Sequence, residues 1–129
     1  MTPADLDLAR RAVACAGWRP GMRTTCGRIV YAIERGCPLG VRMDDRRVRP
    51  DCAAIPHDAL PDLNDPATLG CLLALVREAH GSDRICVVPQ YGVDRWDVRA
   101  QFGTLNRIAA NGPTEPAALV AALEAACQE

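Results

Sequence analysis

The chain has 129 residues, of which 49% are hydrophobic and 24% are charged, and its formal net charge is −1. These values are typical of a globular domain of roughly 50 to 250 residues, and they exclude a disordered or collagen-like chain. No apolar run approaches the roughly 18 to 20 residues that span a bilayer, and the first residues lack the basic start and apolar stretch of a signal peptide. We therefore expect a cytoplasmic protein that folds as a single domain over residues 1–129.

The first expected element is a helix over about residues 3–16. Thr2 can cap this helix, and Pro3 suits its first position because proline has no backbone N–H to pair. Apolar residues then recur at helical spacing until Gly17, at Leu6, Ala9, Val13 and Ala16. This pattern predicts an amphipathic helix that ends at the glycine.

A β region follows between Trp18 and Arg49, where glycines and a proline separate short extended stretches. Residues 28–33 alternate as expected for a strand with one well-buried face, which would carry Ile29, Tyr31 and Ile33. A helix is the competing interpretation of that stretch. After Val41, the polar residues 44–47 predict the tip of a tight hairpin.

Residues 50–66 contain four prolines and no periodic pattern, which predicts an irregular segment longer than most loops in a compact domain. The clearest helix of the chain then covers residues 66–80. Asp65 is its expected cap and Gly81 its expected end. Its apolar stripe consists of Leu69, Leu72, Leu73 and Val76, so we expect the central helix of the core.

The last third of the chain predicts two strands and a helix. Residues 85–89 form a short apolar strand, and a turn over 91–94 leads into residues 95–102. The second strand alternates strictly, with Trp96, Val98, Ala100 and Phe102 expected to face inward and Arg95, Asp97, Arg99 and Gln101 expected to face water. A final helix covers about residues 114–127. The fold class is therefore α+β, a sandwich-like arrangement of three helices and a mostly antiparallel sheet.

Seven cysteines occur, an odd number without any CxxC pair, so we expect free thiols. The nearest approach to a ligand cluster is Cys52 with His57, but structural zinc usually needs four ligands, with two of them in a tight pair. We therefore expect no metal and no cofactor. Cys71 and Cys86 stand in apolar stretches, where cysteine behaves as a small buried hydrophobe.

One central segment, residues 61–79, resembles a segment of small uncharacterised proteins of tailed bacteriophages and prophages, which are similar to the phage α/β/α (ABA) sandwich family. Trp18-Arg19-Pro20-Gly21-Met22 lies upstream in those proteins as it does here. Residues 112–115, with the amphipathic stretch 118–126, recur in the same group. Together these segments cover about a third of the chain.

The resemblance implies a phage or prophage origin and a sandwich of helices and a sheet, but it implies no activity and carries over no functional residue. The chain departs from the family at two places. His80 stands where members of the family often carry a tryptophan, and the tract from Cys52 to Ala59 is longer than theirs. A binding role of that tryptophan would not carry over to this chain.

Charge is unevenly distributed along the chain. All fifteen basic residues are arginine, which excludes the chemistry of a Schiff-base or phosphate-loop lysine. Residues 19–49 carry eight arginines against three acidic residues, a net charge of +5, whereas residues 50–70 carry four aspartates and no arginine. The candidate partner-binding residues are the arginines of the predicted hairpin, Arg42, Arg46, Arg47 and Arg49.

The function that we expect is a non-enzymatic protein-binding module, because arginine is a usual anchor of protein interfaces. The resemblance adds a host or phage protein as the partner, for example a component of a host defence system. The alternative is a nucleic-acid-binding accessory protein that uses the same arginines. The net charge of −1, the isoelectric point of about 6.1 and the presence of only five aromatic residues disfavour that alternative.

A second alternative is an enzyme with a cysteine nucleophile and a histidine base. Cys52 with His57, or any cysteine with His80, supplies the residue types, but the flanking residues match no catalytic signature. We therefore assign no catalytic residues. A homodimer is compatible with each of these hypotheses.

Overall fold

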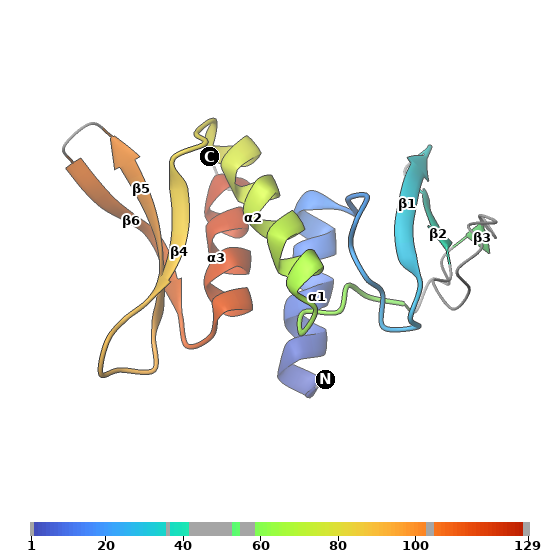
Figure 1. Ribbon diagram of the computed structural model, residues 1–129, viewed down its shortest axis with the longest axis horizontal. Coiled ribbons are helices and arrows are strands. Elements are labelled where there is room, and N and C mark those ends of the chain that lie inside the picture. The colour runs from blue at the N-terminus through green and yellow to red at the C-terminus, as the bar shows by residue number, and fades with distance from the viewer. Residues whose placement is uncertain (1, 36, 42–52, 55–58, 103–104, 128–129) are drawn as a thin grey trace. The chain divides into compact units, whose positions relative to one another are not determined.

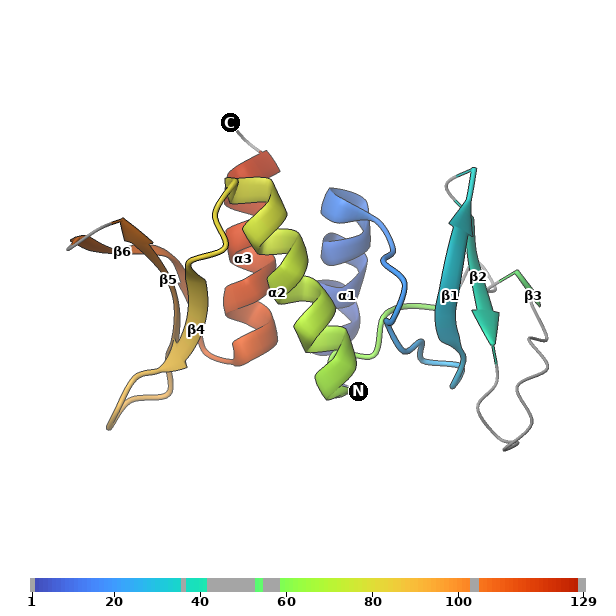
Figure 2. The ribbon, with the colours of Figure 1, turned by 45° about the horizontal axis from the view of Figure 1, so that its top comes forward.

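The structure is a computed structural model that describes residues 2–35, 37–41, 53–54, 59–102 and 105–127. This part of the chain is an α+β fold with three helices and two antiparallel sheets (Figures 1 and 2). It divides into two compact units, which we call unit one (residues 1–71) and unit two (residues 72–129). No helix within the described ranges is long and apolar enough to cross a membrane.

The three expected helices are confirmed as α1 (Pro3–Ala16), α2 (Pro66–His80) and α3 (Glu115–Cys127). Each helix is preceded by a residue whose side chain caps it, namely Thr2, Asp65 and Thr114. The Thr2 hydroxyl accepts a hydrogen bond from the Asp5 backbone N–H at 3.2 Å, and the Asp5 carboxylate accepts from the Thr2 backbone N–H at 3.0 Å. The hydrogen bonds from the Thr2 backbone and side chain lower the pKa of Asp5. This reciprocal pairing satisfies N–H groups that have no partner within the helix.

Unit one contains the sheet β1 (Ile29–Glu34), β2 (Cys37–Val41) and β3 (Ala53–Ala54), in that order and antiparallel throughout. The strand β3 lies inside the stretch expected to be irregular, where it pairs with β2. The predicted hairpin tip at residues 44–47 lies outside the described residues. The buried hydrophobic core of this unit consists of Ala9, Ala12, Met22, Val30, Ala59 and Leu63.

The expected burial of β1 is wrong. Val30 is buried, whereas Tyr31 is 61% exposed and Ile33 is exposed as well. The register with β2 shifts between Val30 and Ala32, so Tyr31 lies at a bulge. The Val30 backbone also pairs with the preceding segment, because its N–H donates to the Met22 carbonyl at 2.8 Å. This pairing directs Val30, and not its neighbours, into the core.

Unit two contains the sheet β4 (Ile85–Pro89), β5 (Trp96–Phe102) and β6 (Leu105–Gly112), also antiparallel and in chain order. The helix α3 packs against one face of this sheet (Figure 2). Gly112 allows the close approach, because a Cβ atom at that position would lie 2.8 Å from the Ala118 backbone nitrogen. The core of unit two is formed by Leu72, Val76, Ile85, Val98, Ala100, Ala118, Leu119, Val120, Ala122 and Leu123.

The C-terminal half of α2 is tied to the other elements of unit two by side-chain hydrogen bonds. Arg77 Nε donates to the Ile85 carbonyl at 2.9 Å, and His80 Nε2 lies 3.0 Å from the Ala122 carbonyl oxygen. Leu72 and Val76 of the predicted stripe are fully buried, whereas Leu69 and Leu73 are only half-buried, and the helix that packs against the sheet of unit two is α3. His80 therefore has a structural hydrogen bond in this fold.

The expectation that the cysteines are free thiols is wrong for two of them, because Cys15 and Cys127 are disulfide-bonded. Disulfide formation depends on a Cα···Cα separation of about 4.4 to 6.8 Å in the fold, which the spacing along the chain does not reveal. Cys26, Cys37 and Cys86 are exposed free thiols. Cys86 is thus not the buried residue that its apolar surroundings predicted, because its neighbour Ile85 occupies the buried position of β4.

We expect that replacing Leu72 with alanine lowers the free energy of unfolding by about 2 to 5 kcal/mol, because the change leaves a cavity around a fully buried position. A denaturant titration measures the loss. Leu69→Ala, at a half-buried position on the same helix, is the matched control and should cost less. A loss below about 1 kcal/mol for Leu72→Ala would contradict the buried position of this helix face.

We also expect at most five reactive thiols per unfolded chain without reductant, because two of the seven cysteines are disulfide-bonded. A thiol-reactive dye in denaturant counts them. After reduction the count should rise to seven. Seven thiols before reduction would show that the disulfide is absent from the purified protein.

Candidate functional site

The candidate residues chosen from the sequence, Arg42, Arg46, Arg47 and Arg49, lie outside the described residues, so their role stays a prediction. Cys52 and His57 lie outside them too. Of the two histidines, only His80 is described, and it contacts the Ala122 carbonyl. A candidate site therefore has to be found among the polar clusters and exposed side chains of the described residues.

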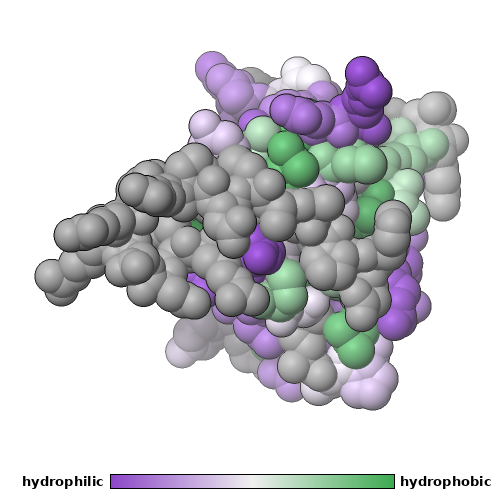
Figure 3. Space-filling model, turned by 90° about the vertical axis from the view of Figure 1, so that its right-hand side faces the viewer, coloured by the Kyte–Doolittle hydropathy of each residue, from purple (hydrophilic) through white to green (hydrophobic). Residues whose placement is uncertain are grey.

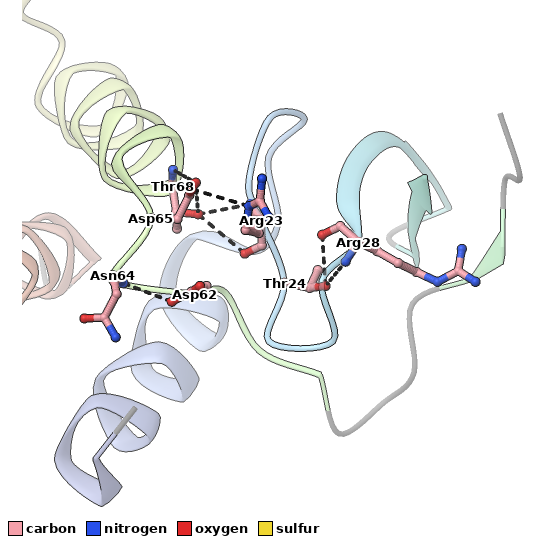
Figure 4. A network of polar contacts seen from close by, with 7 residues as sticks. All are labelled: Arg23, Thr24, Arg28, Asp62, Asn64, Asp65 and Thr68. Carbon is pink, nitrogen blue, oxygen red and sulfur yellow. Dashed lines mark hydrogen bonds and ion pairs between the residues drawn. The ribbon is translucent and has the colours of Figure 1, made fainter. Parts of the chain in front are cut away.

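The first polar cluster lies in unit one around Thr68, a fully buried residue in the first turn of α2 (Figure 4). The Thr68 hydroxyl accepts from the Arg23 backbone N–H at 3.0 Å and donates toward the Asp65 carboxylate at 3.2 Å. Asp65 also caps α2, since it accepts from the Thr68 backbone N–H at 3.0 Å. Arg23 Nε lies 3.4 Å from the same carboxylate.

Residues of the surrounding loops add further hydrogen bonds to this cluster. The Asp62 backbone N–H donates to the Arg23 carbonyl at 2.8 Å, and the Asp62 carboxylate accepts from the Asn64 backbone N–H at 3.0 Å. The Thr24 hydroxyl donates to the Arg28 backbone carbonyl and accepts from the Arg28 backbone N–H. The polar groups of the cluster thus pair with one another, which indicates that they hold the segments of unit one together.

Unit one has two other features with some of the properties of a site. A shallow, open pocket of about 330 Å³ is lined by Leu6, Thr25, Asp62 and Asn64. The carboxylate of Asp62 is already used in the turn with Asn64, so the pocket offers little that would orient a small molecule. Cys71 lies nearby in the chain, where its thiol donates to the Pro20 carbonyl at 3.6 Å, and burial raises its pKa. A raised pKa disfavours the thiolate and hence nucleophilic chemistry.

The second polar cluster lies in unit two, around Asp97 on β5. The sequence predicted that Asp97 faces water, but the residue is fully buried. Arg95 Nε lies 3.0 Å from its Oδ1 atom, and Arg99 Nη2 lies 3.6 Å from its Oδ2 atom. The Gln90 side-chain amide donates a hydrogen bond to Oδ2. Three neighbouring side chains thus replace the water that a carboxylate on a solvated strand face would bind.

The balance of charge and hydrogen bonds in this cluster is incomplete. Two guanidinium groups share one carboxylate, so the cluster carries a net charge of +1. Oδ1 of Asp97 contacts Arg95 as an ion pair, but among the described residues it accepts no hydrogen bond of good geometry, and the buried Nε of Arg99 has no hydrogen-bond partner there either. A buried donor without a partner costs about 1 to 3 kcal/mol.

The Asp97 cluster anchors the loop between β4 and β5, which we call the hairpin loop (residues 90–95). Gln90 and Arg95 form its base, where the Gln90 backbone N–H donates to the Arg95 carbonyl at 2.8 Å. The Arg95 N–H donates to the Val93 carbonyl at 2.8 Å, and Gly92 has a φ of 82°, in the left-handed region that suits glycine. Both ends of the loop thus bond to Asp97 with their side chains.

The hairpin loop, which connects β4 and β5 at the lower left of Figure 1, carries two exposed side chains, Tyr91 and Val93. Tyr91 is fully exposed and Val93 is 62% exposed. A tyrosine in that position gains nothing from the core of its own unit, and it loses little entropy on binding because it has only two rotatable bonds. Arg95, next to them, is half exposed at 47% of its side chain. Tyrosine and arginine are the residue types that most often dominate the binding energy of protein interfaces.

Exposed apolar residues also occur away from the hairpin loop. Tyr31 and Ile33 lie on β1 in unit one, and Ile108 lies on β6 in unit two. Among the residues that Figure 3 colours, hydrophobic and hydrophilic side chains are interspersed on the face shown. Among the described residues, no buried polar cluster holds Tyr31 in place as Asp97 holds the hairpin loop. The hairpin loop is therefore the better candidate site.

The chemistry of this site suits binding. Asp97 is buried, and its carboxylate is already paired with two arginines and the Gln90 amide. Within the described ranges, no group of three or more His, Cys, Asp and Glu residues could hold a metal ion. Comparison with protein-family models, with curated proteins and with solved structures gives no match. The assignment of a function therefore depends on the site itself.

We expect that Asp97→Asn lowers the free energy of unfolding by about 1 to 3 kcal/mol, because the two arginines lose their counter-charge while remaining partly exposed to water. Hydrogen exchange at the backbone N–H groups of Gln90 and Arg95 should also become faster, since the loop loses its anchor. The matched control is Asp94→Asn, at an exposed position of the same loop, which should change stability by less than about 0.5 kcal/mol. Equal stability and exchange in both variants would contradict the bracing role of Asp97.

Proposed function

We propose that the chain is a non-enzymatic protein-binding module whose contact site is the hairpin loop. The observation that carries this proposal is the fully exposed Tyr91 on a loop whose two ends are held by the buried Asp97. A loop that is already held in one conformation loses less entropy on binding, and the saved entropy strengthens the complex. Val93 and the half-exposed Arg95 enlarge the contact around the tyrosine.

The partner in this proposal is a protein of the host cell or of the phage. The resemblance of residues 61–79 to phage and prophage proteins suggests that origin, and a component of a host defence system is one target that fits it. The expected cytoplasmic location belongs to the same proposal. The disulfide-bonded state of Cys15 and Cys127 argues against that location, because disulfides rarely persist in the reducing cytosol of mesophiles.

The arginines of residues 42–49 stay a second predicted contact for the same partner. Nucleic acid is the competing class of partner for these arginines. The crosslinking experiment below distinguishes a nucleic-acid partner from a protein partner. The net charge of the chain is −1, and Tyr91 is one of only five aromatic residues. Both numbers favour a protein over a polyanion, which needs several cationic contacts and stacking side chains.

The test places a photo-crosslinking phenylalanine analogue at position 91 and illuminates cells that naturally carry the gene. We expect one dominant protein adduct, identified by mass spectrometry, that is lost when Val93→Asp is added. The same analogue at position 31, exposed on β1, is the matched control and should not give that adduct.

The recovered partner then allows an affinity measurement with Tyr91→Ala. We expect a loss of at least tenfold, or about 1.4 kcal/mol, since truncation of an anchoring tyrosine removes most of its contact area. Adducts with nucleic acid, or equal adducts from positions 91 and 31, would contradict the proposed function.

A further inference from the structure

The face of the β4–β6 sheet opposite α3 carries the Asp97 cluster, and its composition follows from the strand register. Val88 on β4 and Asn111 on β6 pair with Asp97, so these three side chains point to the same face. Cys86 and Ile108 pair with Arg99 in the same way. We call this surface the outer face. None of the described helices of unit two covers it (Figure 2).

The accessible charge of the outer face is positive. Its acidic residue, Asp97, is fully buried, whereas the side chains of Arg95 and Arg99 are 47% and 34% exposed. The other residues that the register places on this face are uncharged. Asp94 is exposed on the adjoining hairpin loop and is the nearest acidic residue along the chain.

Among the described residues, Arg99 finds no good acceptor for part of its guanidinium group. Its distance of 3.6 Å to the Asp97 carboxylate is too long for a good hydrogen bond, and its buried Nε–H group has no hydrogen-bond partner within that part of the chain. A guanidinium carries five N–H donors and matches a carboxylate in a planar, two-bond geometry. Because the Arg99 side chain is 34% exposed, a further carboxylate can pair with the accessible part of its guanidinium group and neutralise the excess charge of the cluster.

We propose that the outer face binds an acidic segment of the partner protein, with a carboxylate of that segment paired to Arg99 and the hairpin loop contacting apolar residues beside it. This inference rests on the proposed function and names the chemistry of the partner. On the neighbouring strands, the exposed Ile108 pairs with Arg99, and the half-buried Val88 pairs with Asp97, two residues before Arg99. Apolar neighbours exclude water when the partner is bound, and an ion pair is stronger where water is excluded.

The outer face favours an acidic peptide over a nucleic acid for two reasons. Its excess charge is a single positive charge, whereas tight binding of DNA or RNA needs several phosphate contacts. The uncharged residues that the register assigns to it are aliphatic, amide or thiol side chains, which offer no surface for base stacking.

The first test is an NMR titration of the full chain, labelled with ¹⁵N, with a synthetic peptide of eight glutamates and two leucines. We expect the Arg99 Nε–H signal to shift on addition of the peptide and the shift to saturate. The same peptide with glutamine in place of glutamate should produce no such shift. Binding should weaken as sodium chloride is raised, because salt screens the ion pair.

Variants of two arginines on neighbouring strands make the test specific. Arg99→Gln should weaken peptide binding at least fivefold. The matched control is Arg107→Gln, which removes the same charge from the opposite face, since Arg107 pairs with the buried Ala100. It should change the affinity less than twofold. Arg99→Lys keeps the charge but not the planar geometry, and an unchanged backbone spectrum for it shows that the fold is retained.

Each outcome bears on one proposal at a time. No shift at Arg99, equal losses for the two glutamine variants, or tighter binding of an unrelated DNA duplex would overturn the acidic-peptide inference. If the partner captured at position 91 also binds Arg99→Gln with unchanged affinity, this inference fails while the proposed function stands. Saturable binding of the peptide at Arg99, without any protein adduct at position 91, would instead overturn the hairpin loop as the contact site.

Discussion

The buried carboxylate of Asp97 is the constraint on which the arrangement of the candidate site depends. Removing a carboxylate from water costs several kcal/mol unless charges and hydrogen bonds replace the lost hydration. Here Arg95, Arg99 and the amide of Gln90 supply that replacement. Because two of these residues are the ends of the hairpin loop, the pairing that stabilises the charge also fixes the loop. Rigidity of the loop and the excess positive charge of the outer face thus have one origin.

Polar pairing serves another purpose in unit one. There Thr68, Asp65 and Arg23 join the start of α2 to a segment some 45 positions earlier in the chain, and the donors and acceptors involved bond to one another. The Asp97 cluster differs because it leaves an arginine donor without a partner among the residues that the structure describes. A self-contained network adds stability and defines a local shape. A network with one cation in excess does the same and, in addition, favours an anion at the surface.

The helices and most strands could be predicted from the sequence because their signals are local. Asp65, Pro66 and the stripe through Leu72 and Val76 define α2 within a few turns of chain. Burial of single residues was predicted less well. Strict alternation placed Asp97 in water, although arginines two residues before and after it were a visible signal of pairing. The bulge at Tyr31 and the disulfide-bonded state of Cys15 and Cys127 depend on the three-dimensional structure, which alternation and spacing do not encode.

Gly112 has a consequence for how the sequence can change over evolutionary time. It is only half-buried, and surface positions usually accept many residues. Yet any side chain there would collide with the backbone of α3 at Ala117 and Ala118, which cannot move aside without shifting the helix. Random drift should therefore leave this glycine unchanged while residues on the exposed side of β6 diversify. In a short stretch of otherwise variable sequence, one glycine would stay constant because the backbones of β6 and α3 lie too close together for a side chain.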